Sequence, residues 1–508
     1  MYSSQPLTNP PKMPTIFELL AALAAILIAI YFYITQYCYK YFQRKGIPQL
    51  DPKLPFGNAD LLIHGNKNQS LVFKDVYNDF KQAGARYGGM YMIVQPTFVT
   101  VDPEIVRHIL VKDFAHFVDR GFYHNEKSDP LSAHMFTLEG QKWKSIRGKL
   151  SPTFTSGKMK YMFETVVKCS EPLHEHLEGY VARKEPLDAK RCFANFTVDV
   201  IGSCAFGLDC NSFKEQENKF YEYGMKAVRN NAVTTRLKSL FSLNFPKAAK
   251  FFNMKISLDE VEKFYFDVVR TTLGYRKEQN QTRKDFMQLL IELFDQHQIT
   301  FEEVVAEAFL FFLAGFETSS TTGTFCLFEL AQNQEVQQKL RDEIRETLEK
   351  NEGHVTYEAV HEMKYMSQVV DETLRKYPPL GFLTRKVVKP YTIPGTDITL
   401  DEDVRVFIPS YAMQTDPEYY PEPEKFDPER FNEENKKNHV PFTYLPFGDG
   451  PRNCIGMRFG LMQTKIGLLA LLRNHKFRLN PKTKTPLVFE KTVVFSPEGG
   501  IWLDVERA

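Results

Sequence analysis

Two long apolar runs interrupt the pattern of hydrophobic and polar residues along this 508-residue chain, and the first predicts a membrane anchor. It extends from Leu19 to Tyr39, about the length that a membrane-spanning helix needs, and aromatic residues gather near its end, as at a membrane–water interface. Lys40, Arg44 and Lys45 follow it, and this positive charge predicts a cytosolic location for the rest of the chain. A cleaved signal peptide is the alternative, but its apolar core is normally shorter and follows a more basic segment.

The second apolar run predicts a long buried helix. Thr300 is its expected N-cap, and the helix is expected to extend from Phe301 to Arg345, with its first part buried nearly all round. A further helix is predicted over Met457–Leu472. β-branched residues cluster in three segments that predict short strands, residues 396–400, 404–408 and 492–495. The pattern therefore predicts a mainly α-helical protein with a small β region.

Three parts are expected along the chain. Residues 1–45 form the anchor. Residues 46–58 form a proline-rich hinge, because prolines disfavour helix and stiffen an extended connector; a plain linker is the alternative. Residues 59–508 contain no obvious linker, and we expect one large domain even though this length favours two or more.

Composition excludes several classes of protein. The 64 basic and 63 acidic residues nearly cancel, which disfavours a nucleic-acid-binding protein. The seven cysteines are odd in number and lack CxxC spacing, which argues against a disulfide framework or a cysteine zinc site. Aromatic residues make up 14% of the chain, enough to line a large apolar cavity.

The segment PFGDGPRNCIG, residues 446–456, carries the strongest chemical signal. Its glycines permit tight turns and close approach to a flat cofactor. Cys454 stands just before a predicted helix, whose N-terminus stabilises a thiolate. A glycine-rich turn with an inert cysteine is the alternative. The complete pattern Phe-x-x-Gly-x-Arg-x-Cys-x-Gly, however, resembles the haem-binding signature of the cytochrome P450 family.

This resemblance implies the cytochrome P450 fold, a large helical body around haem b with small sheets, after an N-terminal transmembrane helix. Residues 59–508 are then the catalytic domain. Cys454 is the implied axial ligand of the haem iron, since this family is the known case of cysteine-thiolate haem ligation. The implied cofactor contacts in the same loop are Phe447, Gly448, Arg452 and Gly456.

A second pair of segments resembles the family's structural motifs. Glu372 and Arg375 match its Glu-x-x-Arg motif, and Arg430 lies in the matching partner segment. Residues three apart share a helix face, so the first two can pair. A surface ion pair is the alternative, but the resemblance implies a buried network that supports the haem-binding core.

Within the long apolar helix, residues 314–319 resemble the family's oxygen-activation motif. The resemblance implies that Ala314 contacts the haem and that Glu317 and Thr318 relay protons to dioxygen. Gly315 is expected to let the helix open toward the haem, and a threonine bond back to a carbonyl is expected to distort the helix locally. A kinked helix with a hydrogen-bonded glutamate is the alternative.

Donors for the haem propionates are also implied. Trp143 and Arg147 resemble the family's Trp-x-x-x-Arg segment, and an indole N–H and a guanidinium are natural carboxylate donors. By the same resemblance Arg452, Arg385 and Arg120 join them.

Aromatic residues are expected to line the substrate pocket, although core packing explains each of them equally well. The residues that match pocket positions of the family are Phe117, Phe122, Phe312, Phe316, Phe382, Leu383, Val494 and Phe495. The segment FSLNFPKAAKFF, residues 241–252, resembles the loop that dips into the bilayer and admits lipophilic substrates.

Electrons are expected from NADPH–cytochrome P450 reductase, because the chain itself contains no flavin or nicotinamide motif; cytochrome b5 is a second candidate donor. Four lysines form a candidate basic docking face, for which a solvated helix face is the alternative: Lys142, Lys144, Lys149 and Lys465.

The implied reaction inserts one oxygen atom of O2 into lipophilic substrates at the endoplasmic reticulum membrane. The chain most resembles the insect xenobiotic-metabolising group related to the vertebrate drug-oxidising enzymes, and the segment at residues 150–158 is characteristic of that clan. This resemblance suggests plant toxins or insecticides as substrates. Endogenous steroids, hormones or fatty acids are the alternative. A haem-thiolate protein that does not activate oxygen is disfavoured by the intact Glu317–Thr318 pair.

Overall fold

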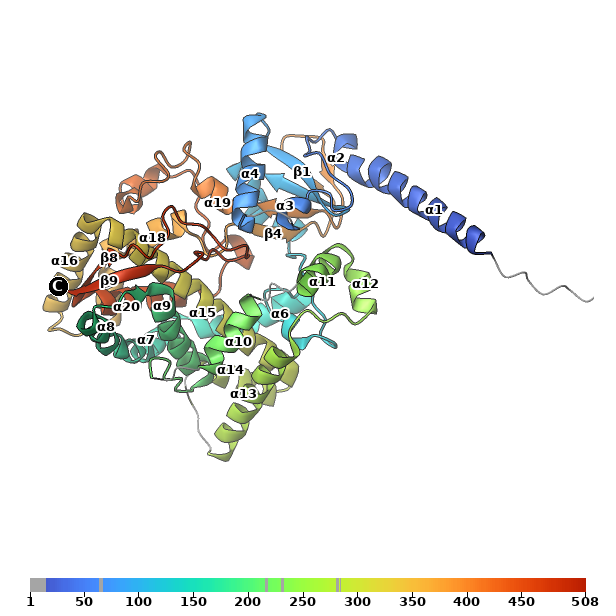
Figure 1. Cartoon of the computed structure of the whole chain (residues 1–508). Helices are drawn as coiled ribbons and strands as arrows, with labels where there is room; N and C mark the ends of the chain where they lie inside the picture. The colour runs from blue at the N-terminus through green and yellow to red at the C-terminus, as the bar shows by residue number, and fades with distance from the viewer. Residues whose placement is uncertain (1–14, 64–66, 215–217, 230–232, 280–282, 284) are drawn as a thin grey trace, which may run out of the picture.

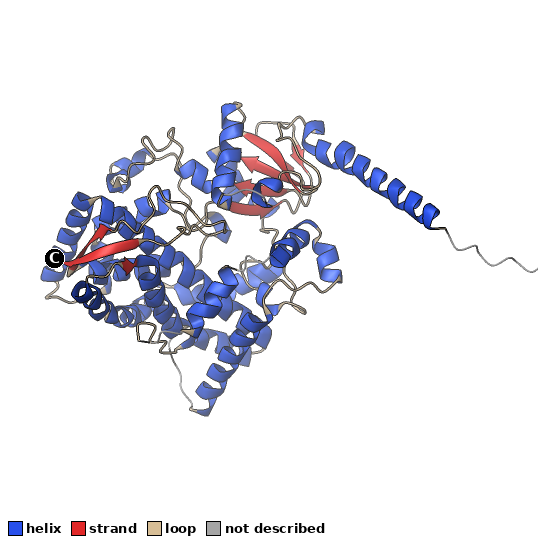
Figure 2. Cartoon of the chain, viewed as in Figure 1, coloured by secondary structure: helices blue, strands red, loops and turns tan. Residues whose placement is uncertain are grey.

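The computed structural model describes residues 15–508 except 64–66, 215–217, 230–232, 280–282 and 284. A helical body surrounds one long helix, α15 (Phe301–Gln332), and small sheets lie on either side of that body (Figure 1, Figure 2). The predicted fold class, mainly α with a small β region, is confirmed.

The central helix α15 begins as its sequence predicts. The Thr300 Oγ1 accepts a hydrogen bond from the Glu303 N–H at 3.2 Å, and the Glu303 carboxylate accepts one from the Thr300 N–H at 2.9 Å. This capping box satisfies two of the free N–H groups at the helix start. The helix packs against α9 (Ala189–Ile201), α18 (Lys364–Lys376) and α20 (Met457–Leu472), and the bounds of α20 are those predicted.

The expected helix from Phe301 to Arg345 is two helices. Asn333 has φ −108° and ψ 76°, outside the helical region, and its side-chain amide donates to the Glu329 carbonyl at 2.8 Å. Such a local bond from side chain to backbone competes with helix continuation. A separate helix, α16 (Gln334–Lys350), therefore begins at the next residue.

Shorter helices surround this centre. Before α9 they are α3 (Asp60–Ile63), α4 (Gln69–Gln82), α5 (Pro103–Arg107), α6 (Gly140–Leu150), α7 (Ser156–Ser170) and α8 (Pro172–Arg183). Between α9 and α15 they are α10 (Lys219–Val228), α11 (Val233–Asn244), α12 (Pro246–Phe251), α13 (Asp259–Glu278) and α14 (Phe286–Asp295). Toward the C-terminus they are α17 (Tyr357–Glu362) and α19 (Ser410–Gln414).

The largest sheet has the strand order β1-β2-β7-β4, with β2 and β7 parallel and the other pairs antiparallel. Its strands are β1 (Tyr87–Met92), β2 (Gln95–Thr100), β4 (Leu383–Lys386) and β7 (Arg405–Ile408). A second sheet joins β3 (Leu187–Asp188), β9 (Trp502–Arg507) and β8 (His475–Leu479), and β5 (Tyr391–Thr392) pairs with β6 (Thr399–Leu400).

The strand predictions are confirmed in part. Strands β6 and β7 lie within the predicted segments 396–400 and 404–408. The third prediction is wrong, because residues 492–495, all of them described, form no strand. The Thr492 N–H donates locally to the Glu490 carbonyl, and Val494 makes a single bridge to Leu380.

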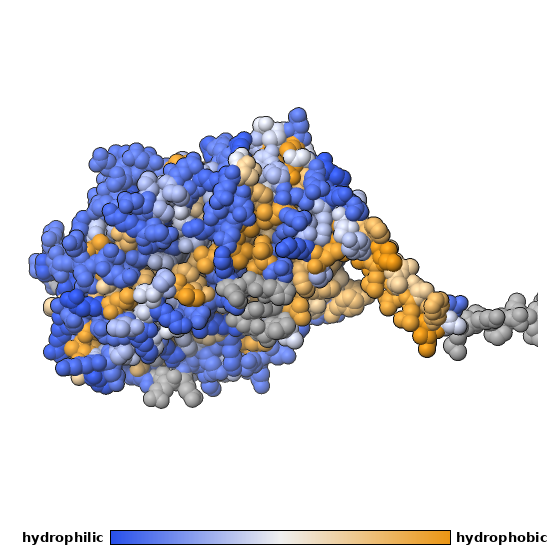
Figure 3. Space-filling view, turned by 45° about the horizontal axis from the view of Figure 1, so that its top comes forward, coloured by the Kyte–Doolittle hydropathy of each residue, from blue (hydrophilic) through white to orange (hydrophobic). Residues whose placement is uncertain are grey.

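The N-terminal apolar segment projects from the body as α1 (Ile16–Phe32), and none of its residues is buried (Figure 1). Figure 3 shows its hydrophobic surface where it leaves the body. The helical stretch continues through α2 (Tyr41–Arg44), and Ile16–Arg44 is long and apolar enough to cross a membrane. It starts three residues before the predicted Leu19, since Thr15 and Glu18 form a capping box.

The segment predicted as a hinge, residues 46–58, lies along β1. The Gly89 N–H donates to the Pro48 carbonyl at 2.8 Å, and the Leu50 N–H donates to the Gly89 carbonyl at 2.9 Å. The buried Asn58 side chain accepts from the Tyr91 N–H at 2.9 Å. These bonds fix the connector to the sheet in this conformation.

Candidate active site

Cys454 lies in a tight loop immediately before α20. Its N–H donates to the Phe447 carbonyl at 2.9 Å, so the loop folds back on itself. Gly450 has φ +71°, and a Cβ there would lie 1.9 Å from the Leu110 carbonyl oxygen. Only glycine fits this position. The glycines of the segment thus allow the turn that presents Cys454.

Cys454 keeps accessible surface, although dense surroundings desolvate its thiol and raise its pKa. Helix α20 contacts α15 close by, where the Gln463 side chain donates to the Gly315 carbonyl at 3.0 Å. The adjacent Ala314 is exposed in the middle of this mostly buried helix. Accessible surface inside a close-packed body marks a place where packing is incomplete, as the binding of a further group requires.

Two arginines near this loop are buried without full hydrogen bonding. Arg452 donates to the carbonyls of Val118 and Leu138 at 2.7 and 2.8 Å, and Arg385 donates to the adjacent Thr384 carbonyl at 2.8 Å. Among the described residues, no acceptor lies in reach of Nη1 of Arg452 or Nε of Arg385. Burial lowers the pKa of Arg452 to about 9 and that of Arg385 well below its usual value.

Two further arginines complete this group. Arg120 donates to the Arg452 carbonyl at 2.8 Å, and both terminal nitrogens of Arg147 donate to Asn453, at 3.0 and 2.9 Å. Burial lowers the pKa of Arg120 to about 10. The carboxylate in contact is Asp119, 3.5 Å from Arg452. Four guanidinium groups thus lie close together, and the two buried ones, Arg385 and Arg452, keep N–H donors for which no acceptor lies in reach among the described residues.

Glu372, Arg375 and Arg430 meet as the sequence predicts. Glu372 and Arg375 are fully buried and form two parallel hydrogen bonds of 2.7 and 2.8 Å. Arg375 also donates to the carbonyls of Gln414 and Pro423, and Arg430 Nε lies 3.5 Å from Glu372. The network ties α18 to the segment that leads to the Cys454 loop.

Thr318 and Glu317 face different surroundings. The Thr318 hydroxyl donates to the Ala314 carbonyl at 2.6 Å, on the accessible side of α15. The Glu317 carboxylate is buried and lies 3.0 Å from Nζ of Lys190, which also donates to Ser320 and Thr321. The second carboxylate oxygen of Glu317 has no hydrogen-bond partner among the described residues.

A family model described as Cytochrome P450 matches residues 54–503. The chain belongs to the cytochrome P450 family. Similar proteins of Drosophila melanogaster include "Probable cytochrome P450 6a23", 42% identical over 96% of this chain and 99% of the relative. "Cytochrome P450 6a8" is 41% identical over 96% and 99%, and "Cytochrome P450 6a2" is 39% identical over 97% and 100%. The predicted P450 fold, the haem b cofactor and the monooxygenase class are thereby confirmed.

The site of this P450 fits its cofactor. Haem b carries two propionates, and buried Arg385 and Arg452 each keep a guanidinium nitrogen without a partner among the described residues, as carboxylate binding requires. The accessible Cys454 thiol would supply a soft ligand for iron. The face of the Trp143 ring contacts the Arg452 guanidinium, whose Cζ lies 4.0 Å from the centroid of the ring.

The predicted pocket residues fall into two groups. The residues without accessible surface, which are packed in the core, are Phe117, Phe312, Phe316 and Phe495. The rings of Phe312 and Phe316, for example, stack with their centroids 5.6 Å apart. Those that keep accessible surface are Phe122, Phe382, Leu383 and Val494. The second group remains the better candidate for substrate contact, while packing explains the first.

The structure adds two details to the expectations for α15. A Cβ at Gly315 would lie 2.4 Å from Ile201, so the glycine allows close packing on α9. The expected bond of the Thr318 hydroxyl back to a carbonyl is present, and the helix extends past it to Gln332. The partner of Glu317, Lys190, was missed; a lysine among the apolar residues of α9 was its only signal.

Proposed function

We propose that this P450 is a membrane-anchored haem-thiolate monooxygenase with Cys454 as the axial ligand of the iron. The accessible Cys454 side chain near two buried, incompletely bonded arginines, Arg385 and Arg452, is the observation that carries this proposal. The propionates are held by Arg120, Arg147, Arg385 and Arg452, with Trp143 beneath Arg452. The remaining haem contacts are Ala314, Phe447, Gly448 and Gly456.

The bound haem supplies the activation of O2 and the insertion of one oxygen atom into substrate. In this proposal the chain supplies the protons. Thr318 donates to the Ala314 carbonyl, which leaves its oxygen free to accept a hydrogen bond from a water molecule. Glu317 is the proposed acidic partner of Thr318 in this relay, and its ion pair with Lys190 holds the carboxylate near that helical turn.

The same proposal places the protein at the endoplasmic reticulum membrane. Helix α1 provides the anchor, and exposed phenylalanines at the two ends of α12 provide a second apolar contact: Phe245, Phe251 and Phe252. These residues lie in the segment 241–252 that the sequence predicted to dip into the bilayer. A surface that contacts the bilayer in this way gives lipophilic substrates a direct route to the protein.

NADPH–cytochrome P450 reductase is the proposed electron donor, with cytochrome b5 as a second candidate. The predicted docking lysines are already engaged in part. Lys142 forms ion pairs with Glu126 and Glu303 at 2.7 and 2.9 Å. Lys149 donates to the Gln298 carbonyl at 2.8 Å, and Lys465 donates to Ser367 at 2.7 Å. Lys144 therefore becomes the preferred docking residue of the four.

Lipophilic xenobiotics are the proposed substrates, supported by the aromatic lining and by the similarity to cytochromes P450 6a. The test is turnover of a panel of plant toxins, insecticides, steroids and fatty acids by the protein with reductase and NADPH. We expect oxidation of several unrelated xenobiotics, and its loss in Cys454→Ala. High-affinity turnover of one steroid or fatty acid alone would contradict the xenobiotic role, and absence of any NADPH-dependent product would contradict the proposal as a whole.

A further inference from the structure

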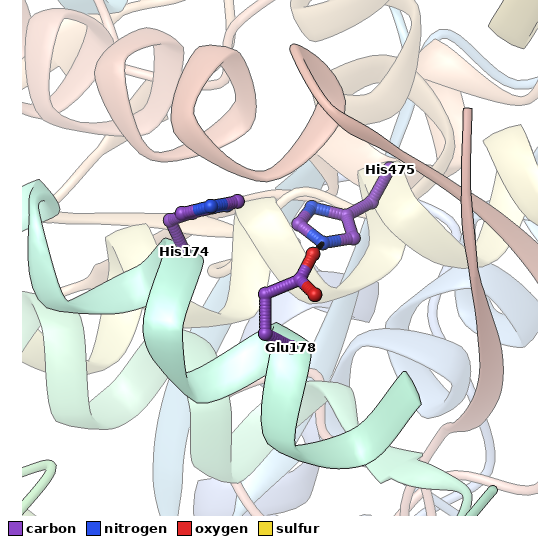
Figure 4. A group of neighbouring side chains, drawn as sticks. All are labelled: His174, Glu178 and His475. Carbon is purple, nitrogen blue, oxygen red and sulfur yellow. Dashed lines mark hydrogen bonds and ion pairs between the residues drawn. The ribbon is translucent and has the colours of Figure 1, made fainter. Parts of the chain in front are cut away.

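A second cluster of ligating side chains lies outside the haem site, between α8 and the β8–β9 sheet. His174 and Glu178 are one turn apart on α8 and so share one face. His475 is the first residue of β8 and reaches the same point from the sheet. One ligand atom of each side chain lies within 4.8 Å of the others, and Figure 4 shows the three converging.

We propose that His174, Glu178 and His475 bind a zinc ion. Two imidazoles and one carboxylate are a known ligand set for Zn²⁺, with a fourth position left to water. Zinc bonds of about 2.0–2.2 Å require ligand atoms roughly 3.3 Å apart. His475 Nε2 and Glu178 Oε1 are 2.9 Å apart, and the exposed His174 side chain can rotate toward them.

Arg507 orients the carboxylate of this site. It lies opposite His475 in the β8–β9 pairing, and its Nε donates to Oε2 of Glu178 at 2.9 Å. The other carboxylate oxygen, Oε1, faces His475 and the proposed metal position. A donor behind a metal-binding carboxylate fixes its orientation. The Arg507 side chain is 73% exposed, so solvent screens its repulsion of a cation.

The His475 side chain is fully buried, so packing sets the position of its ring beside Glu178. The ring nitrogen without a hydrogen-bond partner among the described residues, Nδ1, is not the one that faces Glu178 and is not evidence for a metal. The competing explanation is a purely structural Arg507–Glu178–His475 network, to which His174 contributes nothing.

Bound zinc would join α8 to the sheet that carries the C-terminus. This sheet lies at the end of the body away from α1, so the site faces the aqueous phase if α1 is in the membrane (Figure 1). The expected effect is therefore stabilisation of this end of the protein, independent of the haem chemistry.

The test uses the full-length, haem-loaded protein in nanodiscs, treated with EDTA and titrated with zinc chloride. Equilibrium dialysis with elemental analysis measures bound zinc per chain, and the zinc X-ray absorption spectrum reports its ligands. The key variant is His174→Ala, because an exposed residue can be removed without unfolding the protein. The matched control is His354→Ala, another exposed histidine outside the cluster.

We expect one zinc per chain with imidazole and oxygen ligands, and a rise in the thermal unfolding midpoint with zinc. His174→Ala should weaken binding by at least about tenfold and remove that rise, while His354→Ala should leave both unchanged. Equal zinc binding by the two variants, a sulfur ligand, or no zinc bound by the wild-type protein would overturn the proposal. Each of these results would assign the cluster to the structural network instead.

Discussion

Two buried arginine groups in this P450 differ in what surrounds them. Arg375 forms two hydrogen bonds with Glu372 and donates to two backbone carbonyls, so its charge is matched within the chain. Arg385 and Arg452, near Cys454, are as deeply buried but keep guanidinium nitrogens without an acceptor among the described residues. Their neighbours Arg120 and Arg147 add positive charge.

The difference separates a structural network from a binding site. Removing a charge from water is costly unless ion pairs and hydrogen bonds replace hydration. The Glu372 network meets this condition by itself and therefore stabilises the fold. The arginine group near Cys454 meets it only when an external anion binds, and the haem propionates are suitable anions.

The largest effect is expected from Arg375→Met. The change leaves the Glu372 carboxylate buried beside Arg430, its more distant partner, so the free energy of unfolding should fall by about 3–5 kcal/mol. Urea unfolding of the haem-loaded protein measures it. The control is Lys364→Met, which removes an ion pair exposed on both sides and should cost at most about 1 kcal/mol. Equal losses of unfolding free energy in the two variants would contradict a structural role of the network.

Glu307 is a buried acid whose charge is not matched within the described part of the chain, and it should make the stability of the fold depend on pH. This buried glutamate accepts one hydrogen bond, from the Met135 N–H at 2.7 Å, and burial raises its pKa to about 8. The folded protein thus keeps a proton that the unfolded chain releases near pH 4.5, and stability should fall as pH rises from about 4.5 to 8. Glu307→Gln should gain about 2 kcal/mol relative to wild type between pH 5.5 and 7.5. Parallel unfolding curves at both pH values would contradict this assignment.

Arg385→Met makes the same chemical change as Arg375→Met, but in the arginine group near Cys454. It removes a charge that other arginines repel, so the haem-free protein should not lose stability. It also removes a proposed propionate donor, and haem release to apomyoglobin should accelerate about tenfold, the value of one charge-assisted hydrogen bond. Unchanged haem release together with a loss of stability would place Arg385 in the structural class.

The smallest effect is expected from Thr318→Ala. The hydroxyl is proposed to guide protons and holds no propionate, so haem retention should equal that of wild type. Product formed per NADPH consumed should fall several-fold, because reduced oxygen is released before it reaches the substrate. Product and NADPH measured in the same reaction give this ratio, and full coupling in the variant would exclude the relay role.

Local features of this fold were predictable from sequence, whereas long-range partners were not. The Thr300 capping box, the bounds of α20 and the Cys454 loop depend on neighbouring residues only. The pairing of Glu317 with Lys190 and the packing of Gly315 on Ile201 join segments more than a hundred residues apart. A sequence pattern alone does not specify which side chain fills the space opposite such residues.

The carbon monoxide difference spectrum of the reduced, haem-loaded protein shows whether Cys454 ligates the haem iron. We expect the red-shifted Soret band of thiolate-ligated haem, and its loss in Cys454→Ala. An unshifted band in the wild-type protein, or a red-shifted band that persists in Cys454→Ala, would contradict the assignment of Cys454 as the ligand.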